Sequence, residues 1–157
     1  MGMTFLPERY KIVEAIAPQS SSAATTGDCV SLKNVKQAYV VVQIHGGDAV
    51  YATIYESTGT TVTGAATTGN TYDIWTNTST TAADTLTAQT ASYRQVCTTG
   101  ATHQMLVFQI DPSDLTDGYD CFYVGVGAST ATTKFVSALY LLETAYPADQ
   151  PPAAISD

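Results

Sequence analysis

The stretch from Ala38 to His45 reads AYVVVQIH and is nearly continuously apolar. A short run rich in β-branched residues favours a strand over a helix, and continuous apolarity indicates that both faces of the strand are buried. We therefore expect a central strand over residues 38–45. Gly46, Gly47 and Asp48 follow it and predict a hairpin turn into a second strand at 50–56, in which apolar and polar side chains alternate.

Working outward from this pair, the same period of two recurs along the chain. It predicts further strands at 10–16, 28–32, 71–76, 84–89, 104–110, 119–126 and 134–143, a weak edge strand near 61–63, and a polar loop at 18–27. In the last strand, Val136, Ala138, Tyr140 and Leu142 share one face, and Phe135, Ser137, Leu139 and Leu141 share the other.

One corner between strands has a clear local signature. Asp111 is suited to the N-cap of a helical turn and Pro112 to its first position. Asp114, at the third position, is suited to accept a hydrogen bond from the backbone N–H of the cap residue. Asp117 and Gly118 then predict a turn. We expect a single helical turn here between two strands.

The composition supports an all-β fold. Charged residues make up only 13% of the chain and hydrophobic residues 45%, and threonine alone supplies 26 of the 157 residues. Such a chain favours pleated sheets with hydroxylated surfaces. Eight to ten strands at this spacing predict an antiparallel two-sheet β-sandwich, jelly-roll-like or with Greek-key crossings.

One domain is expected at this length, with an arm at either end. We assign residues 1–9 to an extended N-terminal arm, 10–144 to the sandwich and 145–157 to a Pro-rich C-terminal tail. The tail either frays or lies along a neighbouring subunit.

Charge and targeting signals exclude several partners. The net charge is -8, with six Lys and Arg and no basic run, so phosphate-rich nucleic acid is not an expected partner. We find neither the pattern of a signal peptide nor 18 consecutive apolar residues, and we expect no membrane partner and synthesis in a host cytoplasm. Cys29, Cys97 and Cys121 lack metal or disulfide spacing and are expected to be small core side chains.

The sequence offers little catalytic chemistry. His45 and His103 are its only imidazoles, and each is expected at a strand end, bonded to a turn carbonyl rather than to a metal. We find no nucleophile elbow, no phosphate-binding glycine loop and no zinc-ligand spacing. We therefore predict a protein that is not an enzyme, with no catalytic, cofactor-binding or metal-binding residues.

Two side-chain sets allow a binding role. Asp111, Asp114, Asp117 and Asp120 recur every three residues, which raises a calcium hypothesis, although capping and turn roles account for the first three. Tyr51, Tyr55, Tyr72 and Trp75 could form a sugar-stacking platform if they shared an exposed face, and otherwise close the ends of the core.

Several stretches of the chain resemble small virion proteins that tailed bacteriophages and prophages encode near the major capsid gene. The resemblance is carried by residues 10–13 with Ala17 and Pro18, by 27–34, by 41–47, by 108–111 with 118–121 and 127–129, and by the ending 151–157. By analogy with capsid decoration or cement proteins, it implies a non-catalytic β-sandwich that binds the outside of the assembled head and stabilises it. The implied partners are the major capsid protein and further copies of this chain, as a dimer or trimer. The alternatives are another virion component, such as a head fibre base, tail or baseplate protein, and a glycan-binding β-sandwich.

Overall fold

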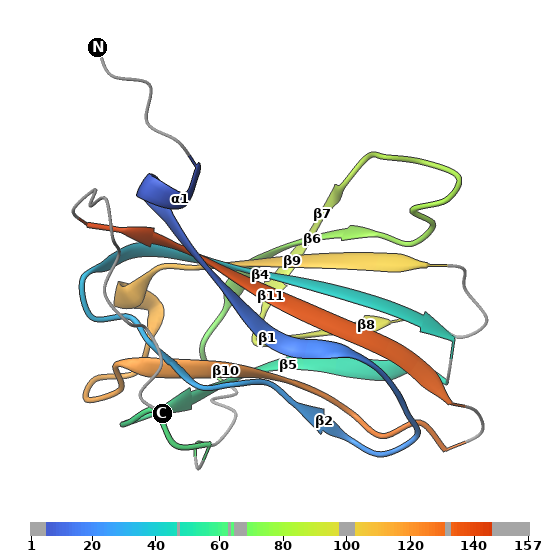
Figure 1. The fold of residues 1–157 in the computed structure, drawn as a ribbon, viewed down its shortest axis with the longest axis horizontal. Coiled ribbons are helices and arrows are strands. Elements are labelled where there is room, and N and C mark those ends of the chain that lie inside the picture. Colours follow the sequence, from blue (N-terminus) through green and yellow to red (C-terminus); the bar gives the residue numbers. More distant parts are fainter. Residues whose placement is uncertain are drawn as a thin grey trace.

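The computed structural model describes residues 6–46, 48–62, 64, 69–97, 103–130 and 133–145. They form an all-β sandwich of two antiparallel sheets, as predicted (Figure 1). In chain order the elements are α1 (Leu6–Arg9), β1 (Tyr10–Ser21), β2 (Thr25–Thr26), β3 (Val30–Ser31), β4 (Val35–Gly46), β5 (Val50–Ser57), β6 (Tyr72–Asn77), β7 (Thr87–Ser92), β8 (Arg94–Cys97), β9 (Gln104–Ile110), the 3-10 turn η1 (Pro112–Asp114), β10 (Cys121–Val126) and β11 (Lys134–Thr144). None of the helices in the described residues is long and apolar enough to span a membrane.

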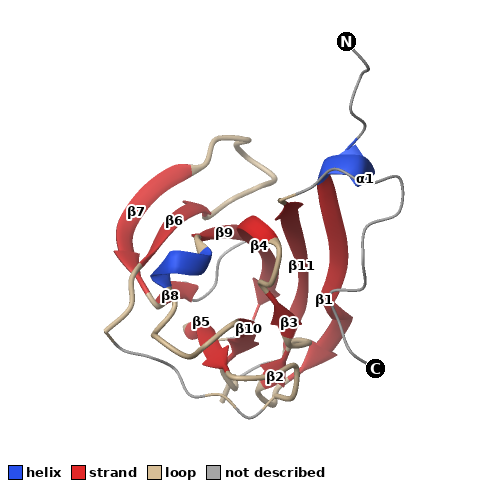
Figure 2. Ribbon diagram, turned by 90° about the vertical axis from the view of Figure 1, so that its left-hand side faces the viewer, coloured by secondary structure: helices blue, strands red, loops and turns tan. Residues whose placement is uncertain are grey.

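The larger sheet has the strand order β1-β11-β4-β9-β6-β7, and the smaller sheet has β2-β10-β5-β8, with β3 also pairing with β10. Without the β6–β7 hairpin, the larger sheet keeps four strands, and the smaller sheet has four positions, one of them shared by β2 and β3, which both pair with β10. The connections from β1 to β2, β3 to β4, β4 to β5, β8 to β9, β9 to β10 and β10 to β11 all pass from one sheet to the other. This alternation gives the double Greek-key arrangement of a jelly roll. The end-on view shows the strands enclosing one core (Figure 2).

The predicted hairpin between residues 38–45 and 50–56 is wrong. β4 pairs with β11 and β9, whereas β5 pairs with β10 and β8, so the two strands lie in different sheets. Gly46 adopts a φ of 72°, which glycine tolerates best, and the chain turns a corner between sheets there. Gly47, the centre of the predicted turn, lies outside the described residues. A turn sequence cannot distinguish a hairpin within one sheet from a crossing to the other sheet, because both need the same sharp change of direction.

The predicted strand at 38–45 is central in its sheet, but only one of its faces is buried. Ala38, Val40, Val42 and Ile44 point into the core, whereas Tyr39 and Val41 are only partly covered and Gln43 is exposed. The alternation in β11 matches the prediction, since Val136, Ala138, Tyr140 and Leu142 are buried.

Element boundaries depart from the predictions mainly at the polar ends of strands. β1 continues through Pro18 to Ser21, where a loop was expected, and β7 overlaps the predicted 84–89 strand but begins and ends three residues later. β8 was not predicted, and Thr61 and Val62 form no strand. Residues 6–9 form a helical turn within the expected extended arm, and 1–5 and 146–157 lie outside the described residues.

The corner at 111–114 forms as predicted. Asp111 accepts from the backbone N–H of Ser113 at 2.9 Å, and Asp114 answers by accepting from the backbone N–H of Asp111 at 3.2 Å. Gly118 takes a φ of 89° in the turn that follows.

Tyr140 joins the two sheets through the middle of the core. Its ring is fully buried and its hydroxyl accepts from the backbone N–H of Val124 at 2.9 Å, while it donates to the carbonyl of Asp28 at 2.9 Å. Val124 lies in β10 between the positions where β2 and β3 pair. The Tyr140 side chain of the larger sheet therefore provides the hydrogen-bond acceptor for a backbone N–H of the smaller sheet.

Gly27 makes this junction possible. Its N–H donates to the carbonyl of Val124 at 2.8 Å. A Cβ at this position would lie 3.0 Å from the Tyr140 hydroxyl and 3.1 Å from the carbonyl oxygens of Ala15 and Val124. A side chain at this position would push these three groups apart by a few tenths of an ångström, so glycine suits the place where the backbone segments meet the hydroxyl.

Replacing Tyr140 with Phe should destabilise the fold by about 1–3 kcal/mol, because the buried N–H of Val124 loses its acceptor. Urea unfolding measures this loss. Tyr51→Phe is the control: Tyr51 is exposed, so its unfolding free energy should change by less than about 0.5 kcal/mol. Equal stability of Tyr140→Phe and the wild type would contradict the role of the hydroxyl.

The protein should lose stability at alkaline pH. Burial raises the pKa of Tyr140 and, together with the neighbouring Glu56 carboxylate, that of Tyr72. Above pH 10 the unfolded chain releases these two protons while the folded protein retains them, so the free energy of unfolding falls as the pH rises. Below pH 10 this contribution is fully present. Denaturant unfolding between pH 8 and 11 tests it, and Tyr72→Phe should flatten the alkaline decline. A decline that is equally steep in the Tyr72→Phe variant would contradict the assignment.

Candidate interaction surface

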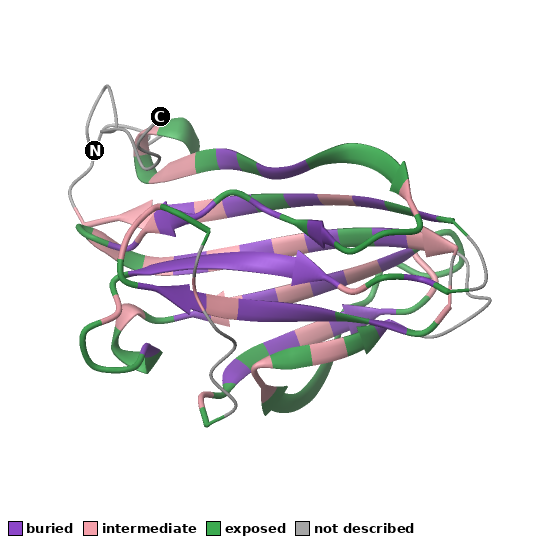
Figure 3. Ribbon diagram, turned by 90° about the horizontal axis from the view of Figure 1, so that it is seen from below, coloured by how far each residue is buried: buried purple, intermediate pink, exposed green. Residues whose placement is uncertain are grey.

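The outer faces of the two sheets differ in how they are covered. In the smaller sheet every residue of β10 is buried, including the outward-facing Cys121, Tyr123 and Gly125 (Figure 3). Tyr123 stacks on Tyr55 at 5.0 Å between ring centroids and donates its hydroxyl to the carbonyl of Gly64 at 2.8 Å. The outer face of β10 is thus covered by the protein's own chain, whereas Tyr51 of β5 and Val96 of β8 stay exposed on the same sheet.

The larger sheet has no comparable cover among the described residues. Its outward side chains include large hydrophobic groups that stay open to solvent: Phe135 is 55% exposed, Ile12 48% and Leu139 43%. Monomeric proteins rarely expose contiguous apolar patches of this kind without a function. This side of the sheet is therefore the candidate interaction surface.

Strand register arranges these side chains in rows. Leu139 lies opposite Val41, which lies opposite Val107, which lies opposite Trp75. The neighbouring rows are Ile12, Leu141, Tyr39 and Gln109 on one side, then Ser137, Gln43 and Met105, and finally Phe135 and His45 on the other. We call the outward side chains of these four rows the outer face. At strand spacings of about 4.8 Å, its five strands span roughly 20 Å.

The outer face carries no formal charge in its centre. The outward residues of β11 from 135 to 141, of β4 from 39 to 45 and of β9 from 105 to 109 include no Lys, Arg, Asp or Glu. Charges lie at its margins, in Glu14, Asp73 and the ion pair of Arg9 with Glu143, in which Nη2 and Oε1 are 2.8 Å apart. In a chain with a net charge of -8, this neutrality means that a partner can cover the face without desolvating ions.

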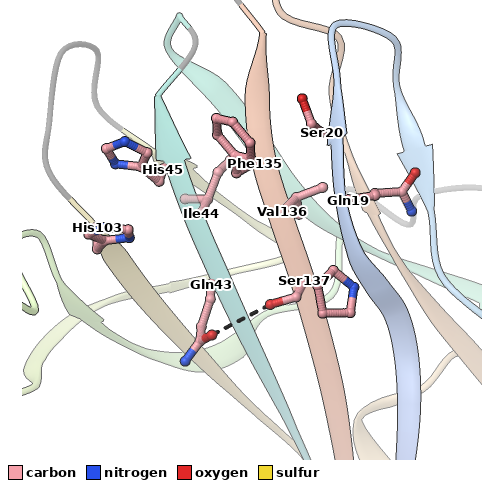
Figure 4. Close-up of a pocket in the computed structure, with 10 residues that line it drawn as sticks. Gln19, Ser20, Gln43, Ile44, His45, His103, Phe135, Val136 and Ser137 are labelled. Atoms are coloured by element: carbon pink, nitrogen blue, oxygen red, sulfur yellow. Dashed lines mark hydrogen bonds between the residues drawn. The ribbon is translucent and has the colours of Figure 1, made fainter.

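One end of the outer face is hollowed into an open groove of about 680 Å³ (Figure 4). Phe135 stands between His45 on β4 and the Pro18–Ser20 segment of β1, and Ser137 donates to Oε1 of Gln43 at 3.5 Å on its floor. The size suits a small set of partner side chains.

His45 and His103 meet at the rim of this groove. Their rings stack with centroids 4.3 Å apart and an angle of 20° between planes. His45 Nδ1 is buried with no hydrogen-bond partner among the described residues, so the turn-carbonyl bond expected from the sequence does not form at this nitrogen. Nowhere in the described ranges do three His, Cys, Asp or Glu side chains gather as metal ligands.

The structure separates the four aromatic residues considered as a sugar platform. Tyr72 is buried in the core, and Trp75 is half-buried on the outer face of the larger sheet. Tyr51 and Tyr55 lie on β5 of the smaller sheet, where Arg94 covers the Tyr51 ring at 4.2 Å. No shared aromatic platform forms from these four.

Two charged side chains are buried and make structural hydrogen bonds, which the sequence analysis did not predict. Glu56 accepts from the Tyr72 hydroxyl at 2.9 Å, from the Thr116 N–H at 3.2 Å and from the Asn70 side-chain amide. Lys134 donates to the carbonyls of Ser21 and Ala23, and burial lowers its pKa. Both fasten loops to the sandwich.

The sequence also missed the outer face, although its signal was present. Apolar residues point to both sides of 38–45, which predicted burial on both faces of that strand, and apolar residues also point to both sides of 134–143. Sequence alternation cannot distinguish a face covered by the same chain from one covered by another molecule.

All three cysteines are buried and unpaired, as predicted. Burial raises the pKa of Cys97 to about 12, and burial with the neighbouring Asp120 raises that of Cys121 to about 12. Burial also raises the pKa of Cys29.

The native thiols should therefore react with iodoacetamide at least about a hundredfold more slowly than the same thiols in urea, because both thiolate fraction and access fall on folding. Mass spectrometry of the labelled peptides measures each site. A cysteine labelled equally fast in the native and unfolded protein would contradict its burial.

No protein-family model matches the sequence, and no curated protein matches it. Among solved structures, the crystal structure of the SPBc2 prophage-derived protein YomS is similar, with a TM-score of 0.44 and 10% sequence identity; the match covers 84% of this chain and 92% of that chain. A superposition this loose does not establish a common fold.

Proposed function

We propose that this protein is a structural component of a tailed-bacteriophage virion that binds the outside of the assembled head, on the major capsid protein, and stabilises the shell without catalysing a reaction. The observation that carries the proposal is the outer face of the larger sheet: a largely apolar surface with no charge at its centre, on a self-contained sandwich. The resemblance of the sequence to small virion proteins gives the partner.

Such a role needs adhesion to an extended surface. Burying apolar area contributes roughly 25 cal/mol per Å², and a standard protein interface buries about 800 Å² on each side. The outer face, with its margins and the groove beside Phe135, is of this order by its strand dimensions. The groove offers a recess for an anchoring side chain of the partner.

Stabilisation of the head then follows from linkage. A protein that binds the assembled shell more tightly than its dissociated subunits shifts the equilibrium toward assembly. Many copies on one shell add their contributions, even where each contact is moderate.

The proposal predicts that Leu139→Lys weakens binding to purified shells lacking the protein by at least about tenfold, because a charge enters the apolar centre of the interface. Co-sedimentation with the shells measures the dissociation constant. Val96→Lys is the matched control, since it places the same charge on an exposed apolar residue of β8 in the smaller sheet.

Circular dichroism should show that both variants keep the β-sheet spectrum. Equal binding by Leu139→Lys and the wild type would remove the outer face from the proposal. Absence of binding by the wild type, with density for the protein on a tail or baseplate in particle maps, would assign it to another virion component.

A further inference from the structure

Three rings form a row across the outer face at the end that holds the groove (Figure 4). Phe135 of β11 lies opposite His45 of β4 in the strand register, with 6.1 Å between ring centroids and 34° between ring planes. His103, which immediately precedes β9, continues the row by stacking on His45. Phe135 and His103 are both exposed, so the row presents ring surfaces to solvent at both of its ends.

Uncharged hydrogen-bonding side chains lie around these rings. The lining of the groove includes the amides of Gln19 and Gln43 and the hydroxyls of Ser20 and Ser137. In the described part of the chain, the side chains of Gln19 and Ser20 make no hydrogen bond to another protein group, and the Nε2 of Gln43 makes none either. The described lining contains no Lys, Arg, Asp or Glu. The groove thus combines ring surfaces with neutral donors and acceptors that are open to a ligand.

The wall of the groove on the β1 side is shaped by a bulge in that strand. Ile16 lies opposite Ala138 and Gln19 lies opposite Val136, so three steps along β1 face two steps along β11. A bulge bends the strand and re-aims the side chains that follow it. Beyond this bulge, Ser20 lies opposite Phe135. The opening beside Phe135 is therefore a feature of the backbone and not of one side-chain rotamer.

We propose that this groove binds a neutral saccharide, with one sugar ring packed on Phe135 and its hydroxyls bonded to the side chains of Gln43 and Ser137. One face of a pyranose ring consists of C–H groups and packs on an aromatic ring, whereas its hydroxyls need donors and acceptors beside that ring. An anionic ligand would find no cation in the described lining. A wholly apolar ligand would leave the amides and hydroxyls without partners.

The dimensions of the groove suit a short oligosaccharide. Its volume of about 680 Å³ lies within the range of small-molecule sites. A second recess of about 120 Å³ shares Gln43, Ile44 and His103 with it, so the two hollows are neighbours on the sheet. Because Phe135 also belongs to the outer face, a saccharide and a covering shell would exclude each other at this end. The proposal therefore concerns the free protein and does not rest on the proposed function.

Nuclear magnetic resonance titration of the purified protein without shells tests the proposal. The probes are cellotetraose, maltotetraose and the tetramer of N-acetylglucosamine, which are all uncharged. At least one should bind with a dissociation constant of about 1 mM or lower. It should shift the ring signals of Phe135, His45 and His103, and it should leave those of Tyr51 on the smaller sheet unchanged.

Variants then test the two kinds of contact. Phe135→Ala should weaken saccharide binding by at least about tenfold, because the ring surface is lost. Gln43→Leu keeps a side chain of similar size but removes the amide, and it should weaken binding by about fivefold. Leu139→Ala is the matched control: it removes an exposed apolar side chain from the same face of β11 outside the groove, and it should bind like the wild type.

The proposal is overturned if none of the three tetrasaccharides binds at about 10 mM. Equal affinities of Phe135→Ala and the wild type, or of Gln43→Leu and the wild type, would also overturn it. Shifts of the same ring signals by N-acetyltyrosinamide, with no response to any saccharide, would assign the groove to an aromatic side chain of a protein partner instead. Shell binding is measured separately, so the failure of one proposal is distinguishable from the failure of the other.

Discussion

The hydroxyl of Tyr140 is the contact on which the arrangement of the sandwich depends. Apart from the β6–β7 hairpin, the described strands pair with strands distant in sequence, so local structure alone does not hold the two sheets together. Tyr140 crosses the core from β11 and satisfies the Val124 N–H in β10, at the gap where the chain passes from β2 to β3. A polar group at the centre of an apolar core is tolerated because its partners are complete, and it fixes one relative placement of the sheets.

The two sheets are held in one fixed arrangement, but their outer faces differ in how they are covered. In the smaller sheet the outer face of β10 is covered, with Tyr123 bonded to the carbonyl of Gly64, and Glu56 fastens the loops near Asn70 and Thr116. The larger sheet keeps an open apolar face because strands β11, β4 and β9 carry hydrophobic side chains on their outward side as well as on their inward side. The fold needs only the inward-facing side chains of these strands for its own core, so the outward-facing side chains are available for a partner.

The sequence predicted the features that depend on neighbouring residues. The alternation of β9 and β11, the capped turn at Asp111 and the burial of the three cysteines follow from local pattern and composition. Which strands pair could not be predicted in this way: Gly46 marks a sharp turn, but only the whole topology decides that it leads to the other sheet. The buried Lys134 and Glu56 were missed because their partners are loop carbonyls and amides, which leave no signature in the chain. The stacked pair of His45 and His103 was also missed, because the two residues are almost 60 positions apart in the chain and leave no local signature.

The central claim is that the outer face of the larger sheet is the adhesive surface of the molecule. An electron cryo-microscopy map of shells decorated with this protein, at side-chain resolution, tests it most directly. The account predicts that Val41, Leu139 and Phe135 lie against the capsid surface, with the smaller sheet facing solvent. A map in which these three side chains face solvent while another surface of the sandwich contacts the shell would contradict it.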